Sequence, residues 1–145
     1  MYFPYLRGRQ NELLCLRELL DRNKLSDTIV PVIEPVRCNS TFFTTIKKFI
    51  EADRQIIIIK NPKVGKFQSD YQEMKKKIDK QADENKKKKL KFNLEVYKAL
   101  LKDSHVVGAY LCDDKIISRC LMGGVDMKDI ISVSYTHLTL PTTSR

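Results

Sequence analysis

The chain has 145 residues, of which 42% are hydrophobic, and its 27 Lys and Arg residues outnumber its 18 Asp and Glu residues, giving a formal charge of +9. That length suffices for one domain with a core, and the basic balance suits contact with phosphates or acidic partners. Because no apolar run approaches the roughly 20 residues that span a bilayer, and Arg7 precedes any apolar region of a signal peptide, we expect a soluble, cytoplasmic protein with no membrane partner.

Short apolar runs, mostly rich in β-branched residues, predict the strands. They cover residues 2–6, 29–36, 56–59 and 106–112, and residues 130–131 open a fifth. The second and third runs are apolar on both faces, which is typical of strands in a parallel sheet that is covered on both sides.

Helical periodicity fills the segments between these runs. Leu13, Leu16 and Leu20 mark a first helix, and Asn39 or Ser40 can cap a second. The segment 62–105 is far longer than an ordinary crossover, and it predicts two helices joined by a lysine-rich stretch. The apolar stripe of the second helix is the clearest in the chain and consists of Phe42, Phe43, Ile46, Phe49 and Ile50.

This alternation predicts an α/β fold in which β/α units build a sheet of parallel strands through right-handed crossovers. A complete TIM-like (β/α)8 barrel needs roughly 250 residues. Residues 1–132 are therefore predicted to be the N-terminal half of such a barrel, with 62–105 as a long basic helical excursion between its third and fourth strands.

The end of the chain has a different character. Residues 133–145 resemble one reading frame of a transposase-end sequencing adapter, so we expect a non-native tail; the alternative is an ordinary Thr-rich terminus. His137 and Tyr135 in this tail are given no functional role.

Charged residues stand where the predicted strands end. In parallel α/β proteins the carboxyl ends of strands meet at one edge of the sheet, so Arg7, Glu34, Lys60 and Asp113 are expected to converge there. Glu34 precedes Pro35, which restricts the local backbone, and it is a candidate metal ligand or general base. The structural alternative is an ion pair of Glu34 with Arg7 or Lys60.

Lys60 and Asn61 follow opposite faces of the third strand, so one of them is expected to point toward the barrel axis. Lys60 there would neutralise a phosphate, form a Schiff base or make a structural ion pair. Asp113 and Asp114 offer a second carboxylate for Mg²⁺, or ordinary turn and helix-cap chemistry.

Two basic features are candidate anion sites. Arg7 and Arg9 flank a glycine just before a helix, where guanidinium groups and backbone donors can meet a phosphate. The lysine-rich segment, with Lys86, Lys87, Lys88 and Lys89 at its centre, either tracks a nucleic-acid backbone or forms a solvated helix pair. The second alternative draws support from the expectation that no aromatic residues interleave to stack bases.

Other cofactor sites find little support. The four cysteines form no Cys-x-x-Cys pair, and His105 is the only histidine before the tail, so a zinc site is not expected and the identity of any metal stays open. The segment 61–65 lacks the glycines of a phosphate-binding loop, so ATP and NAD sites are not predicted.

Three segments resemble the N-terminal half of the bacterial and phage "beta protein" family. They are residues 5–12, residues 31–36 and residues 61–65. Members of that family are mostly uncharacterised and about twice this length, and some are encoded beside a small nuclease-like partner in mobile or defence-type loci. The resemblance implies a barrel-like fold and a partner encoded by a neighbouring gene, and it transfers no catalytic residues.

Three functions remain open at the level of sequence. The first is a non-catalytic partner protein of a phage, mobile-element or defence system, with a barrel platform and a basic surface. The second is a metal-dependent phosphoester hydrolase that uses Glu34, Asp113 and Lys60, with Mg²⁺ as its cofactor. The third is a small-molecule barrel enzyme that uses Lys60.

Overall fold

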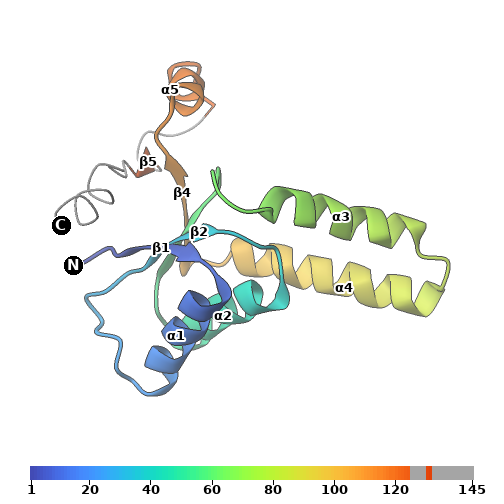
Figure 1. The fold of residues 1–145 in the computed structure, drawn as a ribbon, viewed down its shortest axis with the longest axis horizontal. Helices are drawn as coiled ribbons and strands as arrows, with labels where there is room; N and C mark the ends of the chain where they lie inside the picture. The colour runs from blue at the N-terminus through green and yellow to red at the C-terminus, as the bar shows by residue number, and fades with distance from the viewer. Residues whose placement is uncertain (125–129, 132–145) are drawn as a thin grey trace, which may run out of the picture.

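The computed structural model describes residues 1–124 and 130–131, which form a five-stranded sheet with helices between its strands (Figure 1). Every neighbouring pair of strands is parallel, and the order in the sheet is the order in the sequence. The predicted α/β class with alternating β/α units is therefore confirmed. The tail predicted at 133–145 lies outside the described residues. The strands are β1 (Tyr5–Gly8), β2 (Val32–Pro35), β3 (Ile56–Ile59), β4 (Val106–Leu111) and β5 (Ile130–Ile131).

The first strand begins later than predicted, because residues 2–4 do not belong to it. Proline has no N–H to donate to a ladder, and Pro4 takes part only through its carbonyl oxygen, which accepts the Val32 N–H at 2.8 Å. Before it, Tyr2 forms an isolated parallel bridge with Ile29. The edge of the sheet is thus interrupted at Pro4.

This shift changes the setting of two candidate site residues. Arg7 lies inside β1 and Glu34 lies inside β2, and the two are register partners rather than residues that follow strand ends. Their Cα atoms are neighbours across the sheet, but their environments differ, since Arg7 is exposed and Glu34 is buried.

The helices are α1 (Gln10–Asp21), α2 (Ser40–Glu51), α3 (Phe67–Lys80), α4 (Glu84–Leu101) and α5 (Asp114–Leu121). Three of them begin at a side-chain cap that accepts backbone N–H groups of the first turn. The caps are Asn39 for α2, Asp83 for α4 and Asp113 for α5.

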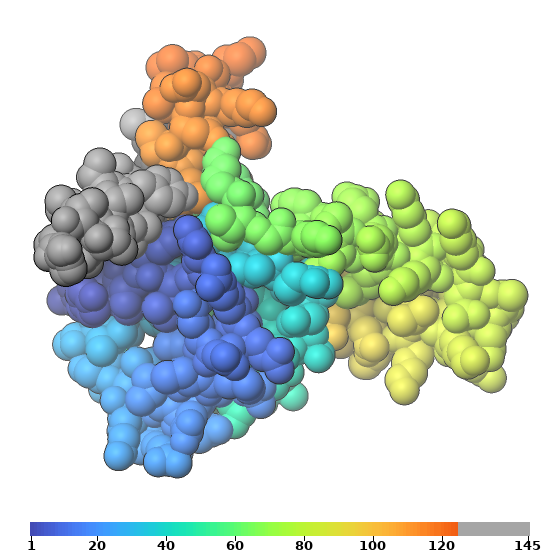
Figure 2. All heavy atoms as spheres, in the orientation of Figure 1, coloured from blue at the N-terminus to red at the C-terminus, as the bar shows by residue number. Residues whose placement is uncertain are grey.

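The connection between β3 and β4 is a helical hairpin that projects from the rest of the chain (Figures 1 and 2). α3 has 14 residues and α4 has 18, which corresponds to about 21 and 27 Å at 1.5 Å per residue. One buried residue from each helix, Ile78 and Leu94, lies between them. The predicted helix pair is present, and its far end extends well beyond the sheet.

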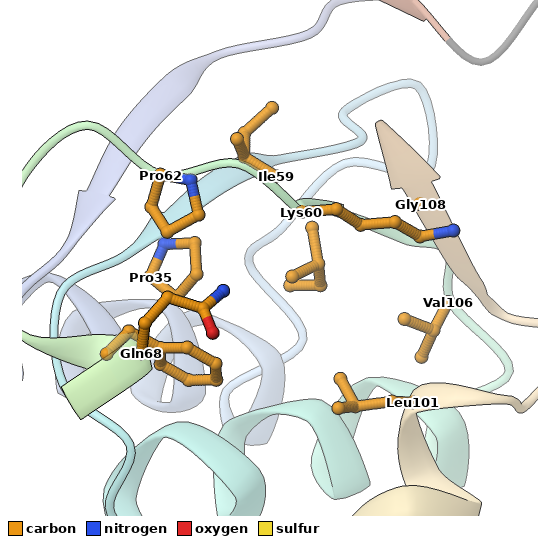
Figure 3. A pocket seen from close by; sticks show the side chains of 10 residues that line it. Pro35, Ile59, Lys60, Pro62, Gln68, Leu101, Val106 and Gly108 are labelled. Atoms are coloured by element: carbon orange, nitrogen blue, oxygen red, sulfur yellow. The ribbon is translucent and has the colours of Figure 1, made fainter. Parts of the chain in front are cut away.

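A cavity of about 180 Å³ remains where the hairpin meets the sheet (Figure 3). Phe67 and Gln68 at the start of α3, and Leu101 at the end of α4, line one side. Val106 and Gly108 of β4 line another side. The hairpin therefore covers the sheet incompletely.

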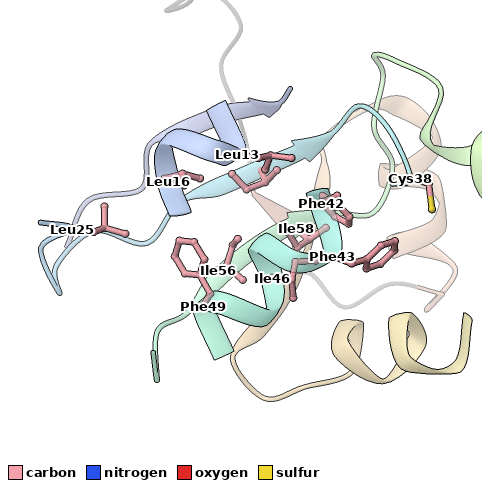
Figure 4. Close-up of a cluster of buried hydrophobic side chains, with 11 residues drawn as sticks. Leu13, Leu16, Leu25, Cys38, Phe42, Phe43, Ile46, Phe49, Ile56 and Ile58 are labelled. Carbon is pink, nitrogen blue, oxygen red and sulfur yellow. The ribbon is translucent and has the colours of Figure 1, made fainter. Parts of the chain in front are cut away.

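The main core lies between the sheet and helices α1 and α2 (Figure 4). The sheet contributes Ile33 of β2 and Ile56 and Ile58 of β3, which share one face because successive side chains of a strand point to opposite faces. Helix α2 contributes its aromatic stripe, as its sequence predicts. The buried members are Leu13, Leu16, Leu25, Ile33, Cys38, Phe42, Phe43, Ile46, Phe49, Ile56 and Ile58.

The other face of the sheet carries a second apolar cluster. Among the described residues its members all come from strands or from the segments that lead into them, and none comes from a helix. Tyr5 packs against it from β1. The buried members are Val30, Val32, Ile57, Ile59, Ala109 and Leu111.

Candidate functional site

Glu34 is the only buried charged side chain among the described residues, with 1% of its surface exposed. Its two carboxylate oxygens accept different donors. The hydroxyl group of Tyr5 donates to Oε2, and the backbone N–H of Lys63 donates to Oε1 at 2.6 Å. These donors compensate the lost hydration of the carboxylate. Neither Arg7 nor Lys60 forms the predicted ion pair with it in the described part of the chain.

Lys63 connects Glu34 to Asp113. Its backbone N–H binds Glu34, while its ammonium group donates to Asp113 Oδ2. The other oxygen of Asp113 accepts the Ile116 N–H at 2.8 Å and so caps α5. Lys63 first, and then the Ile116 N–H, hold the pKa of the Asp113 carboxyl below its ordinary value.

Gly65 lets this loop lie close to β2. Its φ of +75° is in the left-handed region, and a Cβ atom there would come within 2.4 Å of the Val36 carbonyl oxygen. Any other residue would therefore push the loop away from the strand. Because the Lys66 N–H also binds the Val36 oxygen at 2.8 Å, the loop is fixed where the Lys63 N–H reaches Glu34.

Asn61 extends the pairing of β3 with β4 by one step. Its side-chain amide donates to the Leu111 carbonyl oxygen at 2.9 Å, and its side-chain oxygen accepts the Leu111 N–H at 2.7 Å. The side chain thus occupies the place of a backbone unit and fixes the ends of the two strands together.

Lys60 does not converge with Glu34, and this expectation was wrong. It has the parity of Ile56 and Ile58, which pack against the helices, whereas Glu34 has the parity of Val32 and binds Tyr5 on the opposite side. The Lys60 side chain runs across Gly108 and lines the cavity at the hairpin root (Figure 3). Of the four residues that we expected to converge, Arg7, Glu34, Lys60 and Asp113, Lys60 therefore lies apart from Glu34.

Arg7 and Arg9 are both exposed near the start of α1. Arg9 occupies the N-cap position in an extended conformation, without a side-chain cap. Neither guanidinium takes part in an ion pair within the described residues, so both groups are open to solvent anions. Arg7 and Glu34, though register partners, do not bind each other there.

Glu34, Lys63 and Asp113, near the carboxyl ends of the strands, form a hydrogen-bonded network in which the carboxylates already have protein donors. An open metal centre would instead leave carboxylate oxygens for the ion. In residues 1–124 and 130–131, no three His, Cys, Asp or Glu side chains come together as metal ligands. Glu34 and Asp113, which were candidate metal ligands, already accept protein donors. An incoming cation would have to compete with Lys63 for both of them.

The lysines of the hairpin are well exposed. Lys86, Lys88 and Lys89 are exposed and Lys87 is partly exposed, near the start of α4. Phe92 lies one turn further along with 68% of its surface exposed. This exposed ring does not interleave with the four lysines, but it lies close enough to share their surface.

Sequence reasoning also missed Tyr5 and Lys63 as partners of the two carboxylates. Both contacts to Glu34 join residues 29 positions apart, and the ion pair of Lys63 spans 50 positions. Lys63 lies two residues after Asn61, close to the end of a predicted strand. This position was the only local signal that Lys63 could belong to the site. Phe92 was visible in the sequence, beside Lys91.

Comparison with protein-family models, with curated proteins and with solved structures finds no match for this chain. The fold and the site define a parallel α/β-sheet protein with a basic helical hairpin between β3 and β4. No helix in the described segments has the combined length and apolarity for a membrane crossing.

Proposed function

We propose that this chain is the N-terminal half of a TIM-like barrel that serves as a cytoplasmic binding platform, and that its basic hairpin contacts nucleic acid. Five parallel strands in sequential order, with an all-strand cluster on one face and helices on the other, fit half of such a barrel. The observation that carries the function is the projecting hairpin with its exposed lysines.

A platform agrees better with the geometry than an enzyme does. Catalysis needs groups that meet at one point with free valences for a substrate. Glu34 and Asp113 are instead occupied by Tyr5, Lys63 and the start of α5, and Lys60 lies on the other side of the sheet. Such contacts hold strand ends in place.

The hairpin has the two components of a single-strand binding surface. Lysines 86–89 provide positive charge for phosphates, and the exposed ring of Phe92 lies about one turn away, where a base can stack. The same surface suits a second partner, an acidic protein encoded by a neighbouring gene, as the resemblance to the "beta protein" family of phage, mobile-element and defence loci implies.

The test is binding of a labelled single-stranded 20-mer by fluorescence anisotropy between 50 and 200 mM salt. Replacing Lys86, Lys87, Lys88 and Lys89 by Gln should reduce the slope of log affinity against log salt by about 3, at roughly 0.7 per lost phosphate contact. Phe92→Ala should weaken binding by about 1–3 kcal/mol without changing that slope.

A matched variant replaces four exposed lysines elsewhere, Lys24, Lys47, Lys102 and Lys115, by Gln. It has the same net charge but keeps the hairpin lysines, so its slope should stay close to that of the parent chain. Equal losses in the two variants, or an affinity that ignores salt, would contradict a hairpin-specific contact and leave the acidic protein as the partner.

A metal-dependent phosphoester hydrolase is the second candidate. The observation in its favour is that Lys63 joins Glu34 and Asp113 in one network at the carboxyl ends of the strands. If this network acts on phosphoesters, hydrolysis of bis(p-nitrophenyl) phosphate should require added MgCl₂ and disappear in both Glu34→Gln and Asp113→Asn. Hydrolysis that survives either change would exclude these residues as ligands.

A further inference from the structure

We propose that the cavity at the root of the hairpin binds a small organic carboxylate with an apolar body. This site lies on the helix side of the sheet, and the exposed lysines 86–89 of α4 do not line it. Pro35 and Pro62, which adjoin Glu34 and Lys63 in the chain, do line it, whereas Glu34 binds Tyr5 on the opposite face. Its occupancy is independent of nucleic-acid binding, and no step of the function proposed above requires it.

The size and the apolar lining of the cavity determine which uncharged part of a ligand fits into it. Its volume is about 180 Å³, and an apolar cavity of about 150 Å³ is enough for a benzene-sized molecule. The walls are largely apolar, with Ile58, Val106, Leu101 and Phe67 contributing side chains. A single ring or a short branched chain fits this space, whereas a nucleotide is too large.

The ammonium group of Lys60 determines which charge a ligand in the cavity should carry. Of the described residues that line the cavity, Lys60 is the only charged one. It takes part in none of the ion pairs within the described residues. Its ammonium lies 5.6 Å from the centre of the Tyr110 ring, so the nearest compensation is a cation–π contact. Lys60 is exposed, so its ammonium is hydrated, and a carboxylate in the cavity mouth would replace water as its partner.

The end of the Lys60 side chain lies over Gly108. A Cβ atom at position 108 would come within 2.0 Å of Lys60 Cε and 2.5 Å of Nζ, so the lysine occupies space above β4 that a larger residue would fill. Figure 3 shows Lys60 lying over this strand, while Val106, Leu101 and the amide of Gln68 border the same space. Gln68 adds a polar amide to another part of the lining.

The probe is 4-fluorobenzoate, followed by ¹⁹F NMR during titration with the full chain, and 4-fluorobenzyl alcohol is the uncharged analogue of similar size. We expect saturable binding of the benzoate and about fivefold weaker binding of the alcohol, which reflects an ion pair at a solvent-accessible mouth. Lys60→Met should weaken benzoate binding to the level of the alcohol and leave alcohol binding unchanged.

Lys102→Met is the matched control, because this exposed lysine follows Leu101 but does not line the cavity. It removes the same charge and should retain benzoate affinity within about twofold. Val106→Phe, verified as folded by circular dichroism, should abolish binding of both probes by filling the cavity. Absence of saturable binding in the parent chain, or equal benzoate affinity in Lys60→Met, would overturn the proposal.

Discussion

Helix α2 in the sheet-and-helix layer and helix α4 in the hairpin pack on the same side of the sheet, yet they are stabilised in different ways. Five of the 12 residues of α2 are buried, whereas only Leu94 is buried among the 18 residues of α4. α2 therefore depends on tertiary packing, while most of α4 depends on its Asp83 cap and on contacts within the hairpin. The difference shows that a helix can be long without contributing much to the core.

The two regions meet at two aromatic contacts. The ring of Phe42 lies edge-on to Phe67, with centroids 5.2 Å apart, and Phe43 stacks on Tyr97 at 3.8 Å with 4° between the ring planes. Both contacts lie at the root of the hairpin. The root is consequently part of the folded layer, and the remainder of the hairpin is free to present a surface.

The largest effect should come from removing one of these rings. Phe43→Ala should lower the free energy of unfolding by about 3–5 kcal/mol, since Phe43 is 2% exposed and also loses its stack on Tyr97. Urea denaturation measures the change. The same substitution at Phe92, which is 68% exposed, should stay within about 0.5 kcal/mol. A similar loss of stability in Phe43→Ala and Phe92→Ala would show that the hairpin and the sheet-and-helix layer do not differ in packing.

A smaller loss should follow from neutralising Glu34. Glutamine keeps one oxygen for the Lys63 N–H but replaces the other with an NH₂ group, so the Tyr5 hydroxyl can no longer donate there and both bonds lose the charge of the carboxylate. We expect a loss of about 1–3 kcal/mol in urea denaturation. Glu73→Gln on the exposed side of α3 provides the comparison and should cost less than about 0.5 kcal/mol. An unchanged stability in Glu34→Gln would show that the network contributes nothing to the fold.

The sequence predicted those parts of the fold that depend on local patterns. Ile56–Ile59 forms a buried strand because four β-branched residues favour extended backbone, and α2 begins at Asn39 and buries the aromatic stripe that its periodicity indicates. Strand β1 was misplaced because Pro4 interrupts a pattern that is otherwise apolar and aromatic.

The candidate site was less predictable, because its contacts connect distant positions. Parity along β3 required Lys60 and Asn61 to differ in direction, but it did not say which face the helices would cover. The structure places Lys60 on the helix side and uses Asn61 to bind Leu111. A backbone N–H such as that of Lys63 carries no sequence signal, so its bond to Glu34 could emerge only from the fold.

A still smaller, pH-dependent effect concerns His105, before β4. Its ring nitrogens lie 2.8 Å from Asp53 Oδ1 and 2.7 Å from Asp103 Oδ1, and these hydrogen bonds, that to Asp53 first, raise the pKa of His105. A raised pKa in the folded state stabilises the protein fully below the unfolded value of about 6.5, and that contribution disappears as pH rises through the folded value.

Removing the imidazole should therefore matter more in acid than in base. The difference in urea midpoint between the parent chain and His105→Gln should be largest at pH 5.5 and should shrink at pH values above the folded pKa, up to pH 8.5. Because solvent screens the contacts of His105 with Asp53 and Asp103, we expect a modest change in the urea midpoint. A difference that grows with pH would mean that the neutral ring is the stabilising form.

The smallest expected change in stability has the opposite sign to the others. Lysines 86–89 occupy the first two turns of α4, near the positive end of its dipole, and Lys87 lies one turn from Lys91. Glutamine has a similar helix propensity, so replacing these four lysines by Gln should raise the free energy of unfolding by about 0.3–1 kcal/mol. Urea denaturation at low salt measures this gain.

The same variant is expected to lose salt-dependent binding of single-stranded nucleic acid. Stability and binding would then change in opposite directions, which is the relation expected when charges are kept for a partner at some cost to the helix that carries them. If the variant is less stable by more than about 0.5 kcal/mol, these lysines support the fold, and the hairpin loses its distinction from the layer beneath it.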